Sequence, residues 1–187
     1  MKQKRIMTAF MSAVMILGMQ VPVMADESED FDDFLNDEFI EAMESDYLTL
    51  HYTIRDYKAL GIEKPEAIIG TAEDDYDDAV EELQETLDEL ESFDYDSLTV
   101  SQQHDYDVMK FHLENMIALN KYPMFDFYFT PGEGVIDLLT TNLTEYIFYE
   151  DSDFDDYLSV VESVPEYIDE ALELTRKQAK NGYFLTE

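Results

Sequence analysis

The strongest constraint on the fold is a run of apolar residues at steps of four and three within an otherwise acidic stretch. The residues between these apolar positions are nearly all Asp or Glu; the apolar ones are Tyr76, Val80, Leu83, Leu87 and Leu90. In an α-helix this spacing gathers the apolar side chains on one face and leaves the carboxylates on the other. The stretch therefore predicts an amphipathic helix that buries its apolar face and exposes its acidic face.

Two more helices are predicted in the first two thirds of the chain. Residues 31–43 carry apolar side chains at the same helical spacing, after a charged run at 26–33 that we expect to fray. Thr99 is followed three residues later by Gln102, which forms the pattern of a capping box. The box predicts a helix from this point to about Asn120.

The C-terminal third predicts three further helices. Residues 135–149 and 153–163 have helical patterns, and a last helix is expected to begin near Pro165, because proline is favoured at the first helical position. It is expected to end at Asn181–Gly182, since glycine commonly terminates helices. Taken together, the patterns predict an all-α fold of five or six amphipathic helices.

Two segments interrupt this helical pattern. Residues 47–70 are punctuated by glycine and proline and predict a loop-rich connection, with one helical turn near Asp56–Leu60. Residues 122–134 predict an aromatic loop that ends in two glycines. The alternation of Phe125, Phe127 and Phe129 leaves a short strand as an alternative there.

The N-terminus has the three features of a secretory signal peptide. Basic residues open the chain, an apolar run follows at 6–19, and small or aliphatic residues precede Ala25. The run is shorter than the roughly 20 residues that span a bilayer, so an uncleaved anchor is the weaker alternative. We therefore expect cleavage after Ala25, an acidic helical domain at 26–187, and a secreted or extracytoplasmic location without stable membrane insertion.

Charge and composition narrow the possible partners. Without residues 1–25 the chain has eight basic residues against 45 acidic ones, a net charge of −37. Such a chain repels phosphate backbones, so nucleic acid is excluded as a partner. The 12 Phe and 13 Tyr supply enough apolar area to argue against disorder. The absence of cysteine excludes disulfides and catalytic or metal-binding thiolates.

No complete catalytic or cofactor site is found, and no catalytic, cofactor-binding or metal-ligating residue is assigned. His104 and His112 are eight residues apart, which is about 12 Å along a helix and too far for one zinc ion. His51 has no acidic neighbour at ligand spacing. The glycine and serine motifs of nucleotide-binding proteins and hydrolases are also absent.

One acidic segment has two interpretations. Counted from Asp151, the residues at EF-hand ligand positions are Asp151, Asp153, Asp155 and Glu162. However, Asp156 stands where the calcium loop requires glycine, and a helical apolar pattern continues through the segment. We favour the acidic N-terminus of a helix, which the helix dipole stabilises, over a calcium loop.

Several short segments resemble the bacterial "domain of unknown function 885" proteins. Their order and spacing carry the resemblance; they are Leu48–Thr53, Tyr57–Ile62, Ile69–Gly70, Leu98–Thr99, Pro131–Gly134, Asp153–Leu158, Val164–Tyr167 and Gly182. The resemblance covers nearly all of the chain after the signal peptide.

The resemblance implies a mainly helical, often exported protein that is similar to zinc metallopeptidases. Members of the family carry a His-Glu-x-x-x-Gly-His type motif well towards the C-terminus, and this sequence stops before such a segment. We therefore expect the N-terminal part of such a protein, without activity alone, with zinc and a peptide substrate implied for full-length relatives. The alternative is a stand-alone extracellular acidic module that binds a cation or a basic partner.

Overall fold

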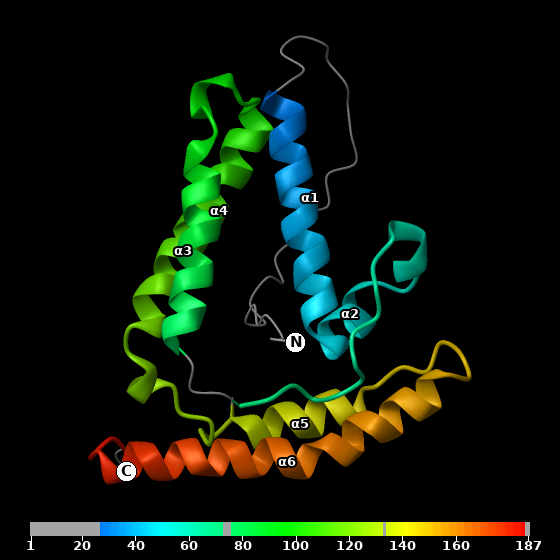
Figure 1. The fold of residues 1–187 in the computed structure, drawn as a ribbon. Coiled ribbons are helices and arrows are strands. Elements are labelled where there is room, and N and C mark those ends of the chain that lie inside the picture. Colours follow the sequence, from blue (N-terminus) through cyan, green and yellow to red (C-terminus); the bar gives the residue numbers. More distant parts are fainter. Residues whose placement is uncertain (1–26, 73–75, 133, 186–187) are drawn as a thin grey trace. The chain divides into compact units, whose positions relative to one another are not determined.

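The computed structural model describes residues 27–72, 76–132 and 134–185, so the predicted signal peptide lies outside the described residues. The described helices are α1 (Glu27–Ser45), α2 (Tyr47–Thr53), α3 (Tyr76–Ser92), α4 (Val100–Asn120), α5 (Val135–Thr144) and α6 (Asp153–Lys180) (Figure 1). Three 3-10 turns occur at Tyr57–Leu60, Tyr95–Ser97 and Pro123–Phe125, and the described residues contain no strand. The prediction of an all-α fold is confirmed. None of the described helices is long and apolar enough to cross a membrane.

The described chain divides into two compact units. The first contains residues up to Ala42 together with Tyr76–Lys121, and the second contains Met43 to residue 72 together with the chain from Tyr122 onward. The chain therefore passes from the first unit to the second, returns to the first, and then crosses again to the second.

The first unit is built from α1, α3 and α4 around one apolar core. Its buried side chains are Phe31, Phe34, Leu87, Leu90, Leu98, Tyr106, Met109, Leu113 and Ile117. The helix predicted from the acidic apolar pattern is α3, and its Leu87 and Leu90 are buried. The capping box is also present, because the Gln102 amide donates to Thr99 Oγ1 while the Thr99 amide donates to Gln102 Oε1.

The first helix begins earlier than the sequence predicted, since residues 27–33 are helical rather than frayed. Contacts from distant parts of the chain hold this turn. Gln102 Nε2 donates to the Ser28 carbonyl at 2.8 Å and to Asp32 at 2.7 Å, and the Asp94 amide donates to Glu27 at 2.7 Å. The acidic residues of the turn also suit the positive end of the helix dipole.

The second unit contains α2, α5 and α6, together with a segment at 61–72 that runs alongside α6. Its core residues are Tyr47, Leu48, Ala67, Tyr146 and Val160. The segment is fixed to α6 at three points, Asp156, Ser163 and Glu170, which bind Lys64 and the amides of Ile69 and Ala72. These three α6 residues are seven apart and therefore lie on one face of the helix.

The prediction of a loop at 47–70 was wrong for its first part. Residues 47–53 form α2, because Asp46 accepts a hydrogen bond from the Thr49 amide at 2.6 Å and Tyr47, Leu48 and Leu50 are buried. Seven residues are too few for a clear helical periodicity, so long-range burial decides this element. The turn expected near Asp56–Leu60 is present as the 3-10 turn Tyr57–Leu60.

Two helix boundaries in the second unit also differ from the predictions. Helix α5 ends at Thr144 instead of Tyr149, since the Tyr149 amide bonds to the Asp153 carboxylate and not to a helical carbonyl. The two helices predicted at 153–163 and from Pro165 are one helix, α6, which bends part-way along its length in Figure 1. Pro165 removes one amide donor, while contacts to residues 69 and 72 hold α6 near the proline.

The aromatic segment at 122–134 has no strand in its described residues. It opens with the 3-10 turn Pro123–Phe125, and Gln178 Nε2 of α6 donates to the Asp126 carbonyl that follows. The segment is thus fixed to α6 through a side chain instead of a strand partner, and the alternation of phenylalanines does not form a strand here.

Candidate functional site

A cavity of about 490 Å³ lies in the second unit, between α2, the turn after it and the start of α6. Its lining comes from chain segments roughly 90 residues apart in sequence. The lining residues are the aromatic Tyr47, His51, Tyr57 and Tyr149, the apolar Leu50 and Ile54, the basic Arg55, Lys58 and Lys64, and the acidic Asp56, Glu150, Asp153 and Asp156.

An imidazole held among tyrosine rings forms one wall of the cavity. The His51 ring stacks on Tyr146, with centroids 4.1 Å apart and planes within 11°, and the Tyr149 ring lies 5.5 Å away. His51 Nε2 is 2.9 Å from the Ile147 carbonyl oxygen. When Nε2 carries the proton of a neutral ring it donates this bond, and Nδ1 keeps a lone pair. Sequence analysis assigned no role to His51, and the structure places it at the cavity.

Two buried phenols join α2 to the segment that precedes α6. The Tyr47 and Tyr146 hydroxyls are 2.6 Å apart, and the Tyr146 hydroxyl is 3.5 Å from the Asp153 carbonyl. Burial raises the pKa of Tyr146 to about 12, against the effect of the Tyr47 hydrogen bond. Burial also raises the pKa of Tyr47, with the Tyr146 hydrogen bond acting in the same direction. Both phenols are therefore protonated at neutral pH and tie the wall together.

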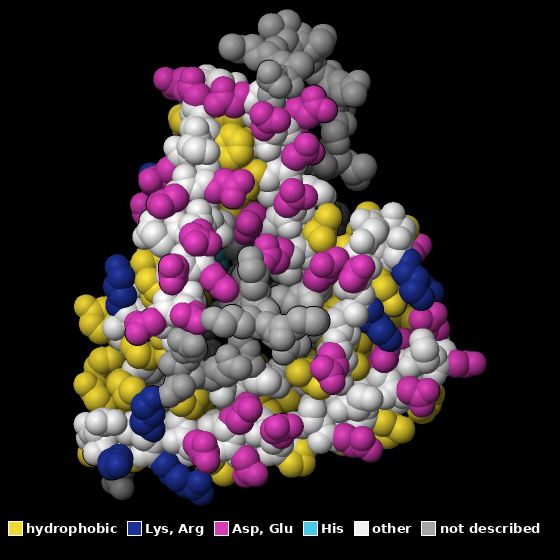
Figure 2. Space-filling view, viewed as in Figure 1, with side chains coloured by type: hydrophobic (Ala, Val, Ile, Leu, Met, Phe, Trp, Pro, Cys, Tyr) yellow, Lys and Arg dark blue, Asp and Glu magenta, His cyan; other side chains and the backbone are white. Residues whose placement is uncertain are grey.

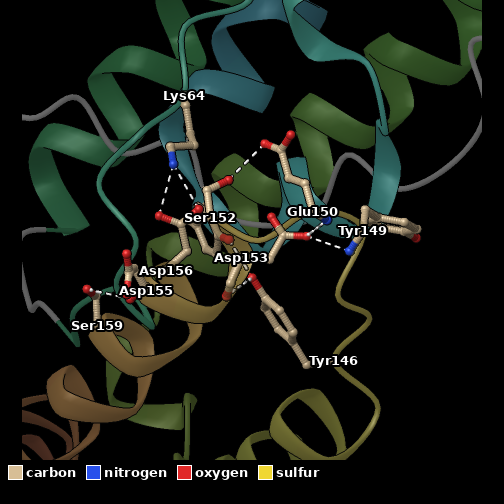
Figure 3. A network of polar contacts seen from close by, with 10 residues as sticks. Lys64, Tyr146, Tyr149, Glu150, Ser152, Asp153, Asp155, Asp156 and Ser159 are labelled. Atoms are coloured by element: carbon tan, nitrogen blue, oxygen red, sulfur yellow. Dashed lines mark hydrogen bonds and ion pairs between the residues drawn. The ribbon is translucent and has the colours of Figure 1, made fainter.

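The carboxylates at the cavity have partners within the chain (Figure 3). Asp153 is 7% exposed and accepts from the amides of Tyr149 at 2.6 Å and Glu150 at 3.0 Å. Both oxygens of Asp156 bind Lys64 Nζ, at 2.8 and 2.9 Å. Glu150 accepts from the Ser152 hydroxyl, and Asp56 caps the turn at the Ala59 amide. These bonds offset the concentration of negative charge.

The same contacts bear on the calcium alternative. An EF-hand requires a loop through the segment that begins at Asp151, whereas α6 is helical from Asp153 through Glu162 and beyond. The Asp153 carboxylate accepts hydrogen bonds from the backbone amides of Tyr149 and Glu150. Across the described residues, no group of three or more His, Cys, Asp or Glu side chains could hold a metal ion. The acidic helix N-terminus favoured from the sequence is therefore what this segment forms.

Two basic side chains at the cavity have no oppositely charged partner among the described residues. Arg55 Cζ lies 5.4 Å from the centroid of the Tyr149 ring, and Lys58 Nζ lies 5.4 Å from that of Tyr57. Neither side chain forms an ion pair with any carboxylate among the described residues. Aromatic rings orient a cation without neutralising it. Arg55 and Lys58 therefore remain able to bind an anionic group.

The concentration of cations is unusual for so acidic a chain. Acidic side chains are spread over the face shown in Figure 2, where basic ones are few. Yet three of the 11 basic residues, Arg55, Lys58 and Lys64, fall within ten positions and line one cavity. This clustering is visible in the sequence and is the signal that could have identified the segment. His104 and His112 lie on α4 in the first unit and contribute nothing to the cavity.

Comparison with known families identifies the chain. The family described as "Bacterial protein of unknown function (DUF885)" matches residues 58–187. The chain belongs to this family. The matched part of the DUF885 chain includes Lys58, Lys64 and the acidic residues from Glu150 onward, whereas Asp56, Arg55 and His51 precede it. Searches of curated proteins and of solved structures gave no match.

Proposed function

We propose that this DUF885 chain is the helical ligand-binding part of an exported, metallopeptidase-like protein, and that the cavity of its second unit binds peptides without cleaving them. The observation that carries the proposal is a cavity of about 490 Å³ with aromatic rings and both signs of charge on its walls. The volume is within the range of sites that enclose small ligands.

The lining suits the chemistry of a short peptide. His51 and Tyr149 offer flat rings on which a side chain or a peptide plane can stack. Arg55 and Lys58 offer positive charge, and Glu150 offers a carboxylate whose internal partner is only a hydroxyl. A peptide presents apolar groups, amides and charged ends, and such a mixed wall can contact all of them.

Binding is favoured over catalysis because two of the cavity's carboxylates and its buried phenols are engaged within the chain. Asp153 and Asp156 hold the fold through their hydrogen bonds, and the buried phenols are protonated at neutral pH. The zinc implied for full-length relatives is not fitted by the described residues, which contain no group of metal ligands.

The cation-binding alternative has less support. The carboxylates at the cavity are bonded within the chain, and acidic side chains are spread over the face shown in Figure 2. Among the described residues, no group of three or more His, Cys, Asp or Glu side chains converges to hold a metal ion. A dispersed negative surface mainly keeps a protein soluble. Export rests on the predicted signal peptide at residues 1–25, and release of a chain that begins at residue 26 by the native host would support it.

The test measures peptide binding and peptide cleavage together. The purified chain is titrated against fluorescently labelled short peptides by anisotropy, and the same mixtures are analysed by mass spectrometry for products. We expect saturable one-to-one binding and no cleavage. Absence of saturable binding to every peptide would overturn the binding function, and cleavage that copurifies with the chain would overturn the non-catalytic assignment.

A matched pair of variants locates the binding. Ile54→Trp fills the cavity with a larger side chain and is expected to weaken binding at least tenfold. Ile136→Trp introduces the same change on α5, where Ile136 is 55% exposed and does not line the cavity, and is expected to leave binding unchanged. Equal effects of the two substitutions would place the site elsewhere.

A further inference from the structure

We propose that the cavity selects its peptide by a free carboxylate, the C-terminal one, and that Arg55 and Lys58 are the residues that hold it. This inference rests on the proposed peptide-binding function and names the part of the ligand that the site recognises. The recognised ligand group is an anion, whereas the net charge of −34 by itself favours cationic ligands.

The first step of the argument is that the two cations lack an internal counterion. Of the three basic residues at the cavity, only Lys64 has an ion pair among the described residues, and it engages both oxygens of Asp156. Asp56, the acidic neighbour of Arg55, accepts instead from the Ala59 amide. Asp56 and Asp156 are thus bonded to other groups, and the charges of Arg55 and Lys58 are left for solvent or a ligand.

The second step is that the two cations line the same cavity from positions three residues apart in the chain. Lys58 belongs to the 3-10 turn Tyr57–Leu60, and Arg55 lies two residues before this turn, next to its N-cap Asp56. Each head group lies 5.4 Å from a tyrosine ring centroid that also lines the cavity. Ring contacts of this kind restrict the side chain while its hydrogen-bond donors stay open.

The third step concerns which anion fits. A guanidinium presents paired N–H donors that match the two oxygens of a carboxylate, and an ammonium adds a point charge. The acidic surface repels ligands of high negative charge, but this repulsion is screened beyond about 8 Å at physiological salt. A single carboxylate can therefore be held by short-range bonds, and the C-terminus is the one carboxylate that peptides share.

The experiment compares two labelled peptides of identical apolar sequence, one with a free C-terminal carboxylate and one with a C-terminal amide. We expect the full chain to bind the free acid at least tenfold more tightly. Arg55→Gln and Lys58→Gln are each expected to reduce that preference by about tenfold or to abolish it, the scale of a charge-assisted hydrogen bond. Arg55→Lys keeps the charge but loses the paired donors, and is expected to retain only part of the preference for the free acid.

The control variant is Lys110→Gln, which removes the same charge from the first unit, where Lys110 pairs with Glu91 at 2.6 Å. It is expected to keep the preference of the unmodified chain. Arg55 and Lys58 are exposed, so their variants are expected to unfold at the same urea concentration as the unmodified chain.

The outcomes separate this inference from the proposed function. If neither peptide binds the unmodified chain, the peptide-binding function itself fails. If both peptides bind equally, the function stands and the carboxylate anchor is overturned. If the preference survives the combined Arg55→Gln and Lys58→Gln substitutions, a different group holds the carboxylate, which also overturns the inference.

Discussion

Gly132 and Gly134 lie two residues apart in the same loop, and each is glycine for a different physical reason. Gly132 has a φ of 83°, a left-handed conformation that residues with a Cβ rarely adopt. Gly134 has an ordinary φ of −79°. A Cβ on Gly134 would lie 2.3 Å from the Thr130 carbonyl oxygen and 2.6 Å from the Thr130 amide nitrogen. The sequence predicts turn residues at both positions, but only the structure shows the close approach at Gly134.

We expect Gly134→Ala to destabilise the protein by about 1–3 kcal/mol, because the backbone of the loop must move to admit the methyl group. The free energy of unfolding is measured by urea denaturation. Gly132→Asn is the matched control: nothing lies within 4 Å of a Cβ there, and asparagine tolerates the left-handed region. A cost for Gly134→Ala no larger than that of Gly132→Asn would show that the close approach is unimportant.

We expect the Tyr47–Tyr146 pair to make the free energy of unfolding fall at alkaline pH. The pKa of Tyr146 rises from 10.0 to about 12 on folding, so the folded state favours the neutral phenol. This contribution is complete below pH 10 and is lost as the pH rises through about 12. The unfolding free energy, measured by urea denaturation at successive pH values, should therefore fall in this range.

Tyr146→Phe identifies the origin of that effect. The variant is expected to be less stable at neutral pH, because the buried Tyr47 hydroxyl loses its partner, and to show a shallower fall between pH 10 and 12. Tyr183→Phe, at an exposed position, is the control. A fall of unchanged steepness in Tyr146→Phe would assign the alkaline loss to other groups.

At the scale of the elements, α6 shows how long-range contacts override a local signal. The sequence places a helix start at Pro165, yet the helix is continuous from Asp153 to Lys180. On one side of the proline Ser163 accepts from the Ile69 amide, and on the other Glu170 accepts from the Ala72 amide. These bonds fix both halves of α6 to the same extended segment. The backbone hydrogen bond that Pro165 cannot form therefore bends the helix without ending it.

Pro165→Ala is expected to stabilise the protein by about 1–3 kcal/mol, because alanine restores the amide donor and relieves the clash with the preceding turn. The gain is reduced by the greater freedom of the unfolded chain. Thermal and urea unfolding measure it, with the neighbouring exposed Glu166→Ala as the control for helix propensity. Destabilisation by Pro165→Ala would mean that the contacts of the 61–72 segment require the bend.

At the scale of the whole molecule, a large negative charge coexists with exposed apolar side chains. The net charge is −34, and yet large apolar residues on α4 remain in solvent, among them Phe111 at 71% and Leu119 at 67% exposure. Helix α4 is apolar on more than its core-facing side. Exposed apolar groups of this size commonly mark surfaces that bind other proteins or other parts of a chain.

Phe111→Ser is expected to reduce the binding of a hydrophobic dye while changing the unfolding free energy by less than about 0.5 kcal/mol. Dye fluorescence and urea denaturation measure the two quantities. Phe31→Ser is the matched control: Phe31 is 0% exposed in the first core, so this variant is expected to unfold more readily and to bind more dye. Unchanged dye binding in Phe111→Ser would show that this face of α4 does not attract apolar ligands.

The sequence by itself determined the all-α class, helices α3 and α4, and the family. The class and the two helices depend on signals within a few residues, such as the spacing of Leu83, Leu87 and Leu90 or the reciprocal bonds of Thr99 and Gln102. The family depends on the order of short segments along the chain. Local hydrogen bonds and periodicity can be recognised without knowing the path of the chain.

Only the tertiary structure decided the short helix α2, the continuity of α6 and the cavity. Tyr47 of α2 is buried in one core with Tyr146, 99 residues later, and the two hydroxyls share a hydrogen bond. The cavity likewise depends on Arg55 and Lys58 meeting a wall that begins at Tyr149. Contacts between residues far apart depend on how the whole chain packs, and no local pattern specifies which partners will meet.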